Sequence, residues 1–362
     1  MNHLSAKIRA EIENSGTISF ARFMEMALYF PGEGYYEKKR AIGSGGDFFT
    51  SVSVGKLFSE LLAFQFAEWF EEGGNATLQL VEAGAHDGQL ALDVLNWMQQ
   101  FRPNIFHQLN YCILEPSPFR RESQRKTLAE FSGKISWFAD WSDFSALRVP
   151  SFSVVFSNEL FDAMPVHRIG WNAKTKSWFE WGVGFDGANF AWRPLEKSAV
   201  QNHFPALPFE LAEVLPDGFA TEIGLAAPAW WAEAASAVQD GKIMAVDYGL
   251  LEEEFFTPER NHGTARAYYR HQASSDLLAH PGEQDLTAQV NFSKLQRAGE
   301  SAGWKTESLV SQTKFLTGIA ERAWKSPPAF GEWDASRCKQ FQTLTHPEHL
   351  GRPFRVLIQS RL

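Results

Sequence analysis

Four acidic residues stand at points where a short apolar run of the sequence breaks off. They are Glu82, Glu115, Glu159 and Asp247, which follow the apolar runs 77–81, 111–114, 153–156 and 243–246. A carboxylate can accept hydrogen bonds from hydroxyl groups, pair with a guanidinium group, or remove a proton from a reacting nitrogen. These positions are therefore the first candidates for binding or catalysis.

The segment Glu82-x-Gly84-x-x-x-Gly88 joins an apolar run to an amphipathic stretch at 89–101. Its glycines let the backbone approach a ligand, and a following helix would offer free N–H donors. A dinucleotide site needs Gly-x-Gly-x-x-Gly with an acid about 20 residues later, and that spacing is absent. Sites for S-adenosylmethionine (SAM) favour an acid followed by Gly-x-Gly-x-Gly, which fits except that His86 holds the middle position. An ordinary glycine-containing turn stays open as an alternative.

Glu115 strengthens the case for an adenosine cofactor, because it ends the next apolar run, 27 residues after Gly88. A carboxylate at that point can accept hydrogen bonds from both ribose hydroxyls. The alternative is a solvated carboxylate beside the turn at 116–118.

The motif Asn158-Glu159-Leu160-Phe161-Asp162 follows the third apolar run. An amide oxygen at Asn158 could orient an acceptor N–H, and Glu159 with Asp162 could hold a guanidinium or take its proton. Arginine needs such help because its pKa exceeds about 12. Asp247 is a further candidate for this role. The alternatives are a helix cap at Asn158 and a first-turn dipole partner at Glu159.

The elements that position these residues alternate between helix and strand. Apolar strands separated by amphipathic helices predict an open parallel α/β sheet, in which ligands bind at the carboxyl ends of the strands. The expected helices are 4–30, 54–71 and 89–101; the expected sheet strands are 77–81, 111–114, 153–156, 243–246 and 354–360; and the expected hairpin strands are 178–183 and 189–192 around Asp186-Gly187.

The same pattern predicts the domain organisation. Residues 1–75 are expected to form N-terminal helices and a loop rich in glycine and aromatic residues, to which the family resemblance given below assigns the closing of the cofactor site. Residues 76–166 and 234–362 form the α/β core. Residues 167–233 interrupt the alternation and are expected to be an insertion for substrate or partner recognition.

Composition excludes several classes of protein. Lys and Arg total 34 against 43 Asp and Glu, a net charge of −9, which disfavours nucleic-acid binding and favours a basic protein or peptide partner. No apolar run reaches the ~18 residues that span a bilayer. The two cysteines, Cys112 and Cys338, suit a reducing compartment, so we expect a cytoplasmic protein. His346 and His349 lack a third ligand nearby, so no metal site is expected.

Taken in order, the motifs resemble the MidA-like family of SAM-dependent methyltransferases, which includes the mitochondrial complex I assembly-factor arginine methyltransferase. The motifs are Gly34-Tyr35-Tyr36, Gly46-Asp47-Phe48-Phe49-Thr50-Ser51, Val81-Glu82-x-Gly84-x-x-x-Gly88, Leu114-Glu115-Pro116-Ser117-Pro118, Asn158 to Val166, Asp247-Tyr248-Gly249, Gly263-Thr264 and Pro281 to Phe292. Each one is ordinary, but the ordered set from about residue 16 to 318 is specific.

The resemblance implies a class I, Rossmann-like SAM-methyltransferase sheet with an N-terminal helical region and an inserted substrate domain. It implies that SAM binds between the glycine turn and Glu115, under a closing loop. The expected cofactor-binding residues are Gly46, Asp47, Thr50, Ser51, Glu82, Gly84, Gly88 and Glu115. The expected catalytic residues are Asn158, Glu159, Asp162 and Asp247.

The resemblance further implies methyl transfer to a protein arginine, with a subunit of the respiratory complex I type as a candidate substrate. We expect neither nucleic-acid binding nor membrane insertion, and whether the chain forms a homodimer stays open. The alternatives are a non-catalytic assembly factor that keeps the fold, and a small-molecule methyltransferase. A nicotinamide-dependent oxidoreductase is disfavoured by the glycine spacing.

Overall fold

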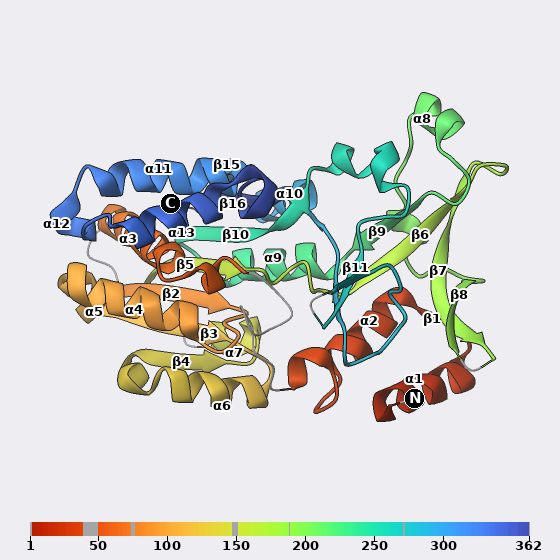
Figure 1. Cartoon of the computed structure of the whole chain (residues 1–362), viewed down its shortest axis with the longest axis horizontal. Coiled ribbons are helices and arrows are strands. Elements are labelled where there is room, and N and C mark those ends of the chain that lie inside the picture. The colour runs from red at the N-terminus through yellow and green to blue at the C-terminus, as the bar shows by residue number, and fades with distance from the viewer. Residues whose placement is uncertain are drawn as a thin grey trace. The chain divides into compact units, whose positions relative to one another are not determined.

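The chain folds into two compact units, whose elements are labelled in Figure 1. The first unit comprises the described residues within 1–41, 161–228 and 250–291, and the second those within 42–160, 229–249 and 292–362. The computed structural model describes residues 2–38, 50–73, 77–146, 151–187, 189–270 and 272–361. No helix in these ranges combines the length and the apolar character that crossing a bilayer requires.

The helices and strands follow one another along the whole chain. The helices are α1 (His3–Ser15), α2 (Phe20–Tyr29), α3 (Leu57–Glu72), α4 (Gln89–Phe101), α5 (Pro103–Gln108), α6 (Pro118–Thr127), α7 (Trp141–Ser145), α8 (Phe209–Val214), α9 (Ala226–Ala237), α10 (Phe292–Ser301), α11 (Gln312–Trp324), α12 (Pro327–Phe330) and α13 (Ala335–Thr345). The strands are β1 (Ile18–Ser19), β2 (Thr77–Ala83), β3 (Leu109–Leu114), β4 (Ile135–Phe138), β5 (Ser151–Asn158), β6 (Val166–Asn172), β7 (Ser177–Asp186), β8 (Asn189–Pro194), β9 (Ala220–Gly224), β10 (Gly241–Leu250), β11 (Arg266–Tyr269), β12 (Gln272–Ser274), β13 (Asp285–Thr287), β14 (Val290–Asn291), β15 (Lys305–Ser311) and β16 (Phe354–Arg361).

The second unit is built on a sheet in the order β15-β16-β10-β5-β2-β3-β4. The strands from β10 to β4 pair in parallel, which confirms the predicted α/β class. The prediction of a wholly parallel sheet is wrong for β15 and β16, because β16 pairs antiparallel with both β10 and β15. An apolar run identifies a strand but carries no information on its direction, so the sequence could not reveal this reversal.

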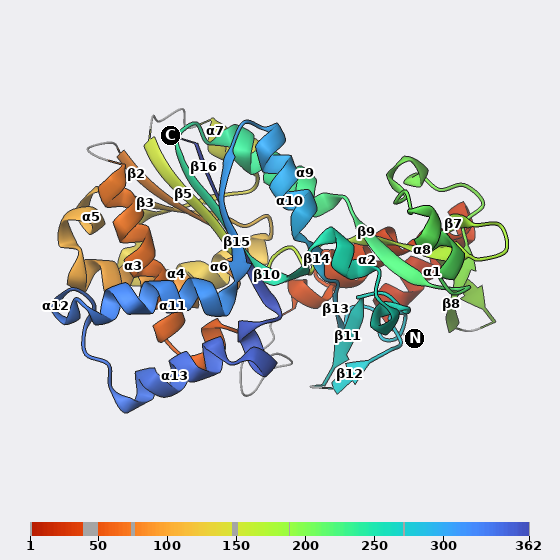
Figure 2. The same ribbon diagram turned by 90° about the horizontal axis from the view of Figure 1, so that it is seen from above.

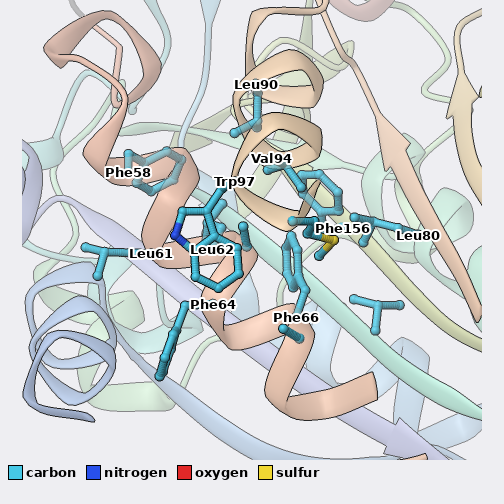
Figure 3. Packing of buried hydrophobic residues seen from close by; sticks show 14 of the residues in the cluster. Phe58, Leu61, Leu62, Phe64, Phe66, Leu80, Leu90, Val94, Trp97 and Phe156 are labelled. Atoms are coloured by element: carbon cyan, nitrogen blue, oxygen red, sulfur yellow. The ribbon is translucent and has the colours of Figure 1, made fainter. Parts of the chain in front are cut away.

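Helices cover both faces of this sheet, as Figure 2 shows for α11 on one side and α10 on the other. Both of these helices contact β15 and β16, and α3 contacts β5. The predicted helix at 89–101 is confirmed by α4, and the one at 54–71 by α3. Almost every residue of α3 is buried. In Figure 3 its Phe58 and Phe66 lie in the core with Trp97 of α4 and Phe156 of β5, and the rings of Phe66 and Phe156 are 4.8 Å apart. This packing fixes the strand ends that carry the candidate site.

The first unit contains two antiparallel sheets. One has the order β1-β7-β6-β9 with β8 beside β7, and the other has the order β12-β11-β13. The predicted hairpin is confirmed: β7 and β8 pair from Asp186 opposite Asn189, and Gly187 supplies the positive φ of 61° that the turn requires. The single helix expected over 4–30 is wrong, because α1 ends at Ser15, where Gly16 takes a φ of 81°. Glycine adopts such angles readily and stops a helix.

Candidate active site

The turn between β2 and α4 takes a backbone path that depends on its glycines. Gly84 and Gly88 have φ angles of 76° and 89°, in the region that side chains disfavour. A Cβ atom on Gly84 would lie 3.0 Å from the Cδ1 atom of Leu160. His86 has a φ of 46°, so it adopts the left-handed conformation typical of the glycine expected at its position. The substitution of histidine for the middle glycine is therefore accommodated by the backbone.

Glu82 is the penultimate residue of β2 rather than the residue after the strand, which corrects its expected place. Its side chain is buried, and the Tyr111 hydroxyl donates to Glu82 Oε2 at 2.6 Å. Burial raises the pKa of Glu82 to about 7, although the bond from Tyr111 acts in the opposite direction. Around neutral pH, the folded chain therefore carries this group in both protonation states.

Glu82 should make the stability of the protein fall with rising pH. The folded chain retains this proton up to about pH 7, whereas the unfolded chain releases it near 4.5, so stability declines between these values. We expect Glu82→Gln, which keeps an acceptor for Tyr111, to be more stable than wild type at pH 8 by on the order of 2–3 kcal/mol and equally stable at pH 4. Urea unfolding across this range tests the expectation, and parallel pH profiles would contradict it.

Glu115 follows β3 directly and is held by two donors. The backbone N–H of Ser117 donates to Oε1 at 3.0 Å, and the side-chain amide of Gln124 donates to Oε2 at 3.1 Å. Only 4% of the residue surface is exposed. The plane of this buried carboxylate is therefore fixed at the carboxyl end of the sheet, next to the turn that carries Gly84 and Gly88.

Asn158 ends β5, and its side chain is anchored on one side only. Its Nδ2 atom donates to Glu159 Oε1 at 3.0 Å, and the backbone N–H of Ser51 donates to the same oxygen at 3.2 Å. Within the described ranges of the chain, the buried Oδ1 atom of Asn158 has no hydrogen-bond partner. Glu159 takes a φ of 54°, an uncommon conformation for a non-glycine residue. Together these features fix an amide oxygen that meets no donor among the residues that the structure describes.

Asp247 lies within β10 and is completely buried. Its two oxygens accept backbone N–H groups, from Leu160 at 3.1 Å and from Tyr248 at 2.8 Å. The side chain thus holds the turn that follows β5. This arrangement suits a residue that shapes the site around Asn158.

Of the loop residues expected to bind cofactor, Thr50 and Ser51 are among those that the structure describes. Gly46 and Asp47 lie outside the described residues. Thr50 exchanges hydrogen bonds with Ser53. Ser51 is buried, and its backbone N–H donates to the Glu159 carboxylate. Its hydroxyl also donates to Gln312 at 3.4 Å.

Asp162 belongs to the first unit, whereas the candidates between Ser51 and Glu159 described above belong to the second. The Asp162 side chain is mostly buried, and its backbone carbonyl accepts the N–H of Ala288 at 2.8 Å. The pKa of the Tyr36 hydroxyl is raised, mainly by burial. The charge of Asp285, the neighbouring Tyr29 and the charge of Asp162 act in the same direction. Asp162 thus lies close enough to Tyr36 for its charge to affect that hydroxyl.

Sequence reasoning missed two residues that support this site. Gln124 is the buried residue of the otherwise strongly polar α6, and Leu160 packs against Gly84. A polar residue in a polar helix gives no periodic signal of burial, so Gln124 could not be found from the pattern. Among the residues that the structure describes, no group of three or more His, Cys, Asp or Glu side chains could hold a metal ion.

Comparison with known proteins gives one family and several relatives. A family model for S-adenosyl-L-methionine-dependent methyltransferases matches residues 61–310. The protein arginine methyltransferase NDUFAF7, mitochondrial, of Mus musculus is 30% identical over 98% of this chain and 82% of its own length. Its counterpart in Danio rerio is 29% identical over 100% of this chain and 87% of its own length.

The fold is similar to that of a solved bacterial protein. The crystal structure of a COG1565 superfamily member from Burkholderia thailandensis, bound to S-adenosyl-homocysteine, superimposes with a TM-score of 0.81. The two sequences are 31% identical, and the match covers 99% of this chain and 92% of the bacterial one.

Proposed function

The chain belongs to the family of S-adenosyl-L-methionine-dependent methyltransferases, and from this premise we propose that it methylates an arginine side chain of a protein substrate. The cofactor of the family is SAM, which supplies an electrophilic methyl group on a sulfonium sulfur when it is bound. The names of the mouse and zebrafish relatives support arginine as the acceptor.

The glycine turn between β2 and α4 is the part of the second unit that we propose binds the cofactor. A Cβ atom on Gly84 would lie 3.0 Å from Leu160, and one on Gly88 would lie 3.1 Å from Leu128. Both glycines also have positive φ angles, so a side chain at either position would be strained. Close approach of a ligand to the backbone needs this kind of turn. We propose that these glycines admit the cofactor and that Glu115 accepts the ribose hydroxyls. The remaining proposed contacts come from Glu82 and from the loop residues Gly46, Asp47, Thr50 and Ser51.

The observation that carries the proposal is the buried Oδ1 atom of Asn158, which has no donor within the described ranges. A buried acceptor without a partner costs about 1–3 kcal/mol, so its persistence calls for an explanation. An N–H of an incoming guanidinium group would satisfy this oxygen. Because Glu159 holds the other end of the amide, the oxygen would meet the substrate in one fixed direction.

The carboxylates near Asn158 complete the proposed site. A guanidinium group must lose a proton around the time of transfer, since its pKa exceeds about 12. We propose that Glu159 holds the guanidinium and takes up this proton. The catalytic role expected of Asp162, which belongs to the first unit, stays a prediction. The bonds from Leu160 and Tyr248 to Asp247 give that residue a positioning role, because they fix the turn behind Asn158.

The partner in this proposal is a protein, and a subunit of the respiratory complex I type is the first candidate. We further propose that the reaction takes place in the cytoplasm, in keeping with two free cysteines, Cys112 and Cys338.

Loss of the protein should remove a methylarginine from the cell. Cells without the chain are compared with cells that express wild type or Asn158→Ala, and methylated peptides are mapped by mass spectrometry. We expect at least one arginine to be methylated only with the wild-type protein. Identical methylarginine maps in all three strains would contradict the proposed substrate.

A further inference from the structure

Gln124 on α6 is a polar side chain that is fully buried. Gln124 is the buried residue of its helix, α6, half of whose residues are charged, and its exposed fraction is 0%. An amide withdrawn from water is unfavourable unless its donors and acceptor are satisfied. Both ends of the Gln124 amide therefore need hydrogen-bond partners within the protein.

Three loops or strands meet at the Gln124 amide. Its Nε2 atom donates to Glu115 Oε2 at 3.1 Å and to the backbone carbonyl of His86 at 3.1 Å. Its Oε1 atom accepts the indole N–H of Trp137 at 3.1 Å. Both amide protons and one oxygen lone pair are thereby used. The amide connects the turn after β2, the residue after β3, and strand β4.

These partners allow one orientation of the amide. With the oxygen and nitrogen exchanged, an NH2 group would face the indole N–H of Trp137, and the oxygen would face the Glu115 carboxylate and the His86 carbonyl. Both sets of contacts would then be repulsive. Trp137 therefore determines which end of Gln124 faces Glu115.

The helix that carries Gln124 also packs directly on the glycine turn. A Cβ atom on Gly88 would lie 3.6 Å from the Cα atom of Gln124 and 3.1 Å from the Cδ1 atom of Leu128. Gln124 thus joins the backbone of the turn to the carboxylate of Glu115 over a short, fully packed path. A side chain of this kind sets the orientation of its neighbour without touching the ligand.

We propose that Gln124 is a positioning residue that fixes Glu115 against the Gly84–Gly88 turn and so sets the selectivity of the site for the ribose hydroxyls of SAM. This inference rests on the proposed contact between Glu115 and the ribose. It assigns Gln124 no contact with the cofactor itself.

The test compares the binding of S-adenosylhomocysteine with that of its 2′-deoxyadenosyl analogue by calorimetry. In wild type we expect the analogue to bind about ten-fold more weakly or worse, because a hydrogen bond to a charged group is lost. In Gln124→Met, which conserves volume, we expect S-adenosylhomocysteine to bind about ten-fold more weakly and the ratio of the two affinities to fall toward unity. Trp137→Phe removes only the N–H that orients the Gln124 amide, so it should lower the ratio of the two affinities about two- to five-fold. This variant provides the test if Gln124→Met does not fold.

Gln79→Met is the matched control. Gln79 is a second buried glutamine, near the other end of β2, where it accepts a hydrogen bond from Ser153 at 3.3 Å. We expect this variant to lose stability but to keep both affinities.

The inference would be overturned if Gln124→Met bound both ligands more weakly by the same factor, so that the ratio of the two affinities stayed as in wild type. A wild-type ratio of unity would overturn the ribose role of Glu115 and the inference with it. No methyl acceptor is present, so the result is independent of the proposed arginine substrate.

Discussion

Glu115→Ala is expected to weaken the binding of S-adenosylhomocysteine by about 100-fold or more. Two ribose hydroxyls bound to one buried carboxylate would each contribute about 1.5–3 kcal/mol, the range for hydrogen bonds to charged groups. The substitution also leaves the amide of Gln124 and the backbone N–H of Ser117 without their acceptor. Isothermal titration of the purified protein measures the effect.

A nearby exposed carboxylate, on the helix that follows Glu115, provides the control for this variant. Glu122 is exposed on α6 and pairs with Lys126 at 3.2 Å. Such an exposed pair contributes little, so Glu122→Ala should bind S-adenosylhomocysteine like wild type. If Glu115→Ala bound the ligand as tightly as Glu122→Ala, the ribose role of Glu115 would be wrong.

Asn158→Ala should lower the rate of methyl transfer by about 100-fold or more while leaving cofactor affinity within a few-fold of wild type. The variant removes the buried oxygen that we propose orients the acceptor nitrogen, and it removes a donor to Glu159. The Asn158 amide bonds to Glu159 and not to Glu115, so we expect binding and turnover to respond separately. Single-turnover assays with saturating SAM measure the transfer step directly.

Asn172, in the first unit, provides a control, because it too is an asparagine at the end of a strand. Asn172 ends β6, and its side chain accepts the backbone N–H groups of Lys174 and Thr175. Asn172→Ala should reduce stability slightly and leave the rate of transfer unchanged. Equal rates in Asn158→Ala and Asn172→Ala would remove Asn158 from the proposed site.

The sequence predicted those parts of the structure that depend on local chemistry. The turn with Gly84 and Gly88 was predictable because glycine at these spacings between a strand and a helix has few other uses. The break at Gly16 could also be inferred from its residue type, yet the apolar spacing on both sides favoured a continuous helix. Glu115 and Glu159 do follow β3 and β5, as the apolar runs indicated.

Other features depend on tertiary packing that local patterns do not encode. Gln124 is buried because α6 packs on the turn and Trp137 needs an acceptor, and both facts require the fold. Nothing in the sequence indicated that Asp247 accepts the backbone N–H groups of Leu160 and Tyr248, while its expected catalytic role stays a prediction. The antiparallel direction of β16 follows from its long-range pairing. Patterns in the sequence thus located the strand ends, whereas the contacts among their side chains needed the structure.

The most direct measurement of the central claim is the chemical identity of the methylated product. Purified protein is incubated with methyl-labelled SAM and an extract of cells that lack the chain, and the labelled protein is hydrolysed to amino acids. We expect wild type to place the label in methylarginine and Asn158→Ala to place almost none there. Label in a different amino acid or in the small-molecule fraction, or no label from a protein that binds S-adenosylhomocysteine, would contradict this expectation.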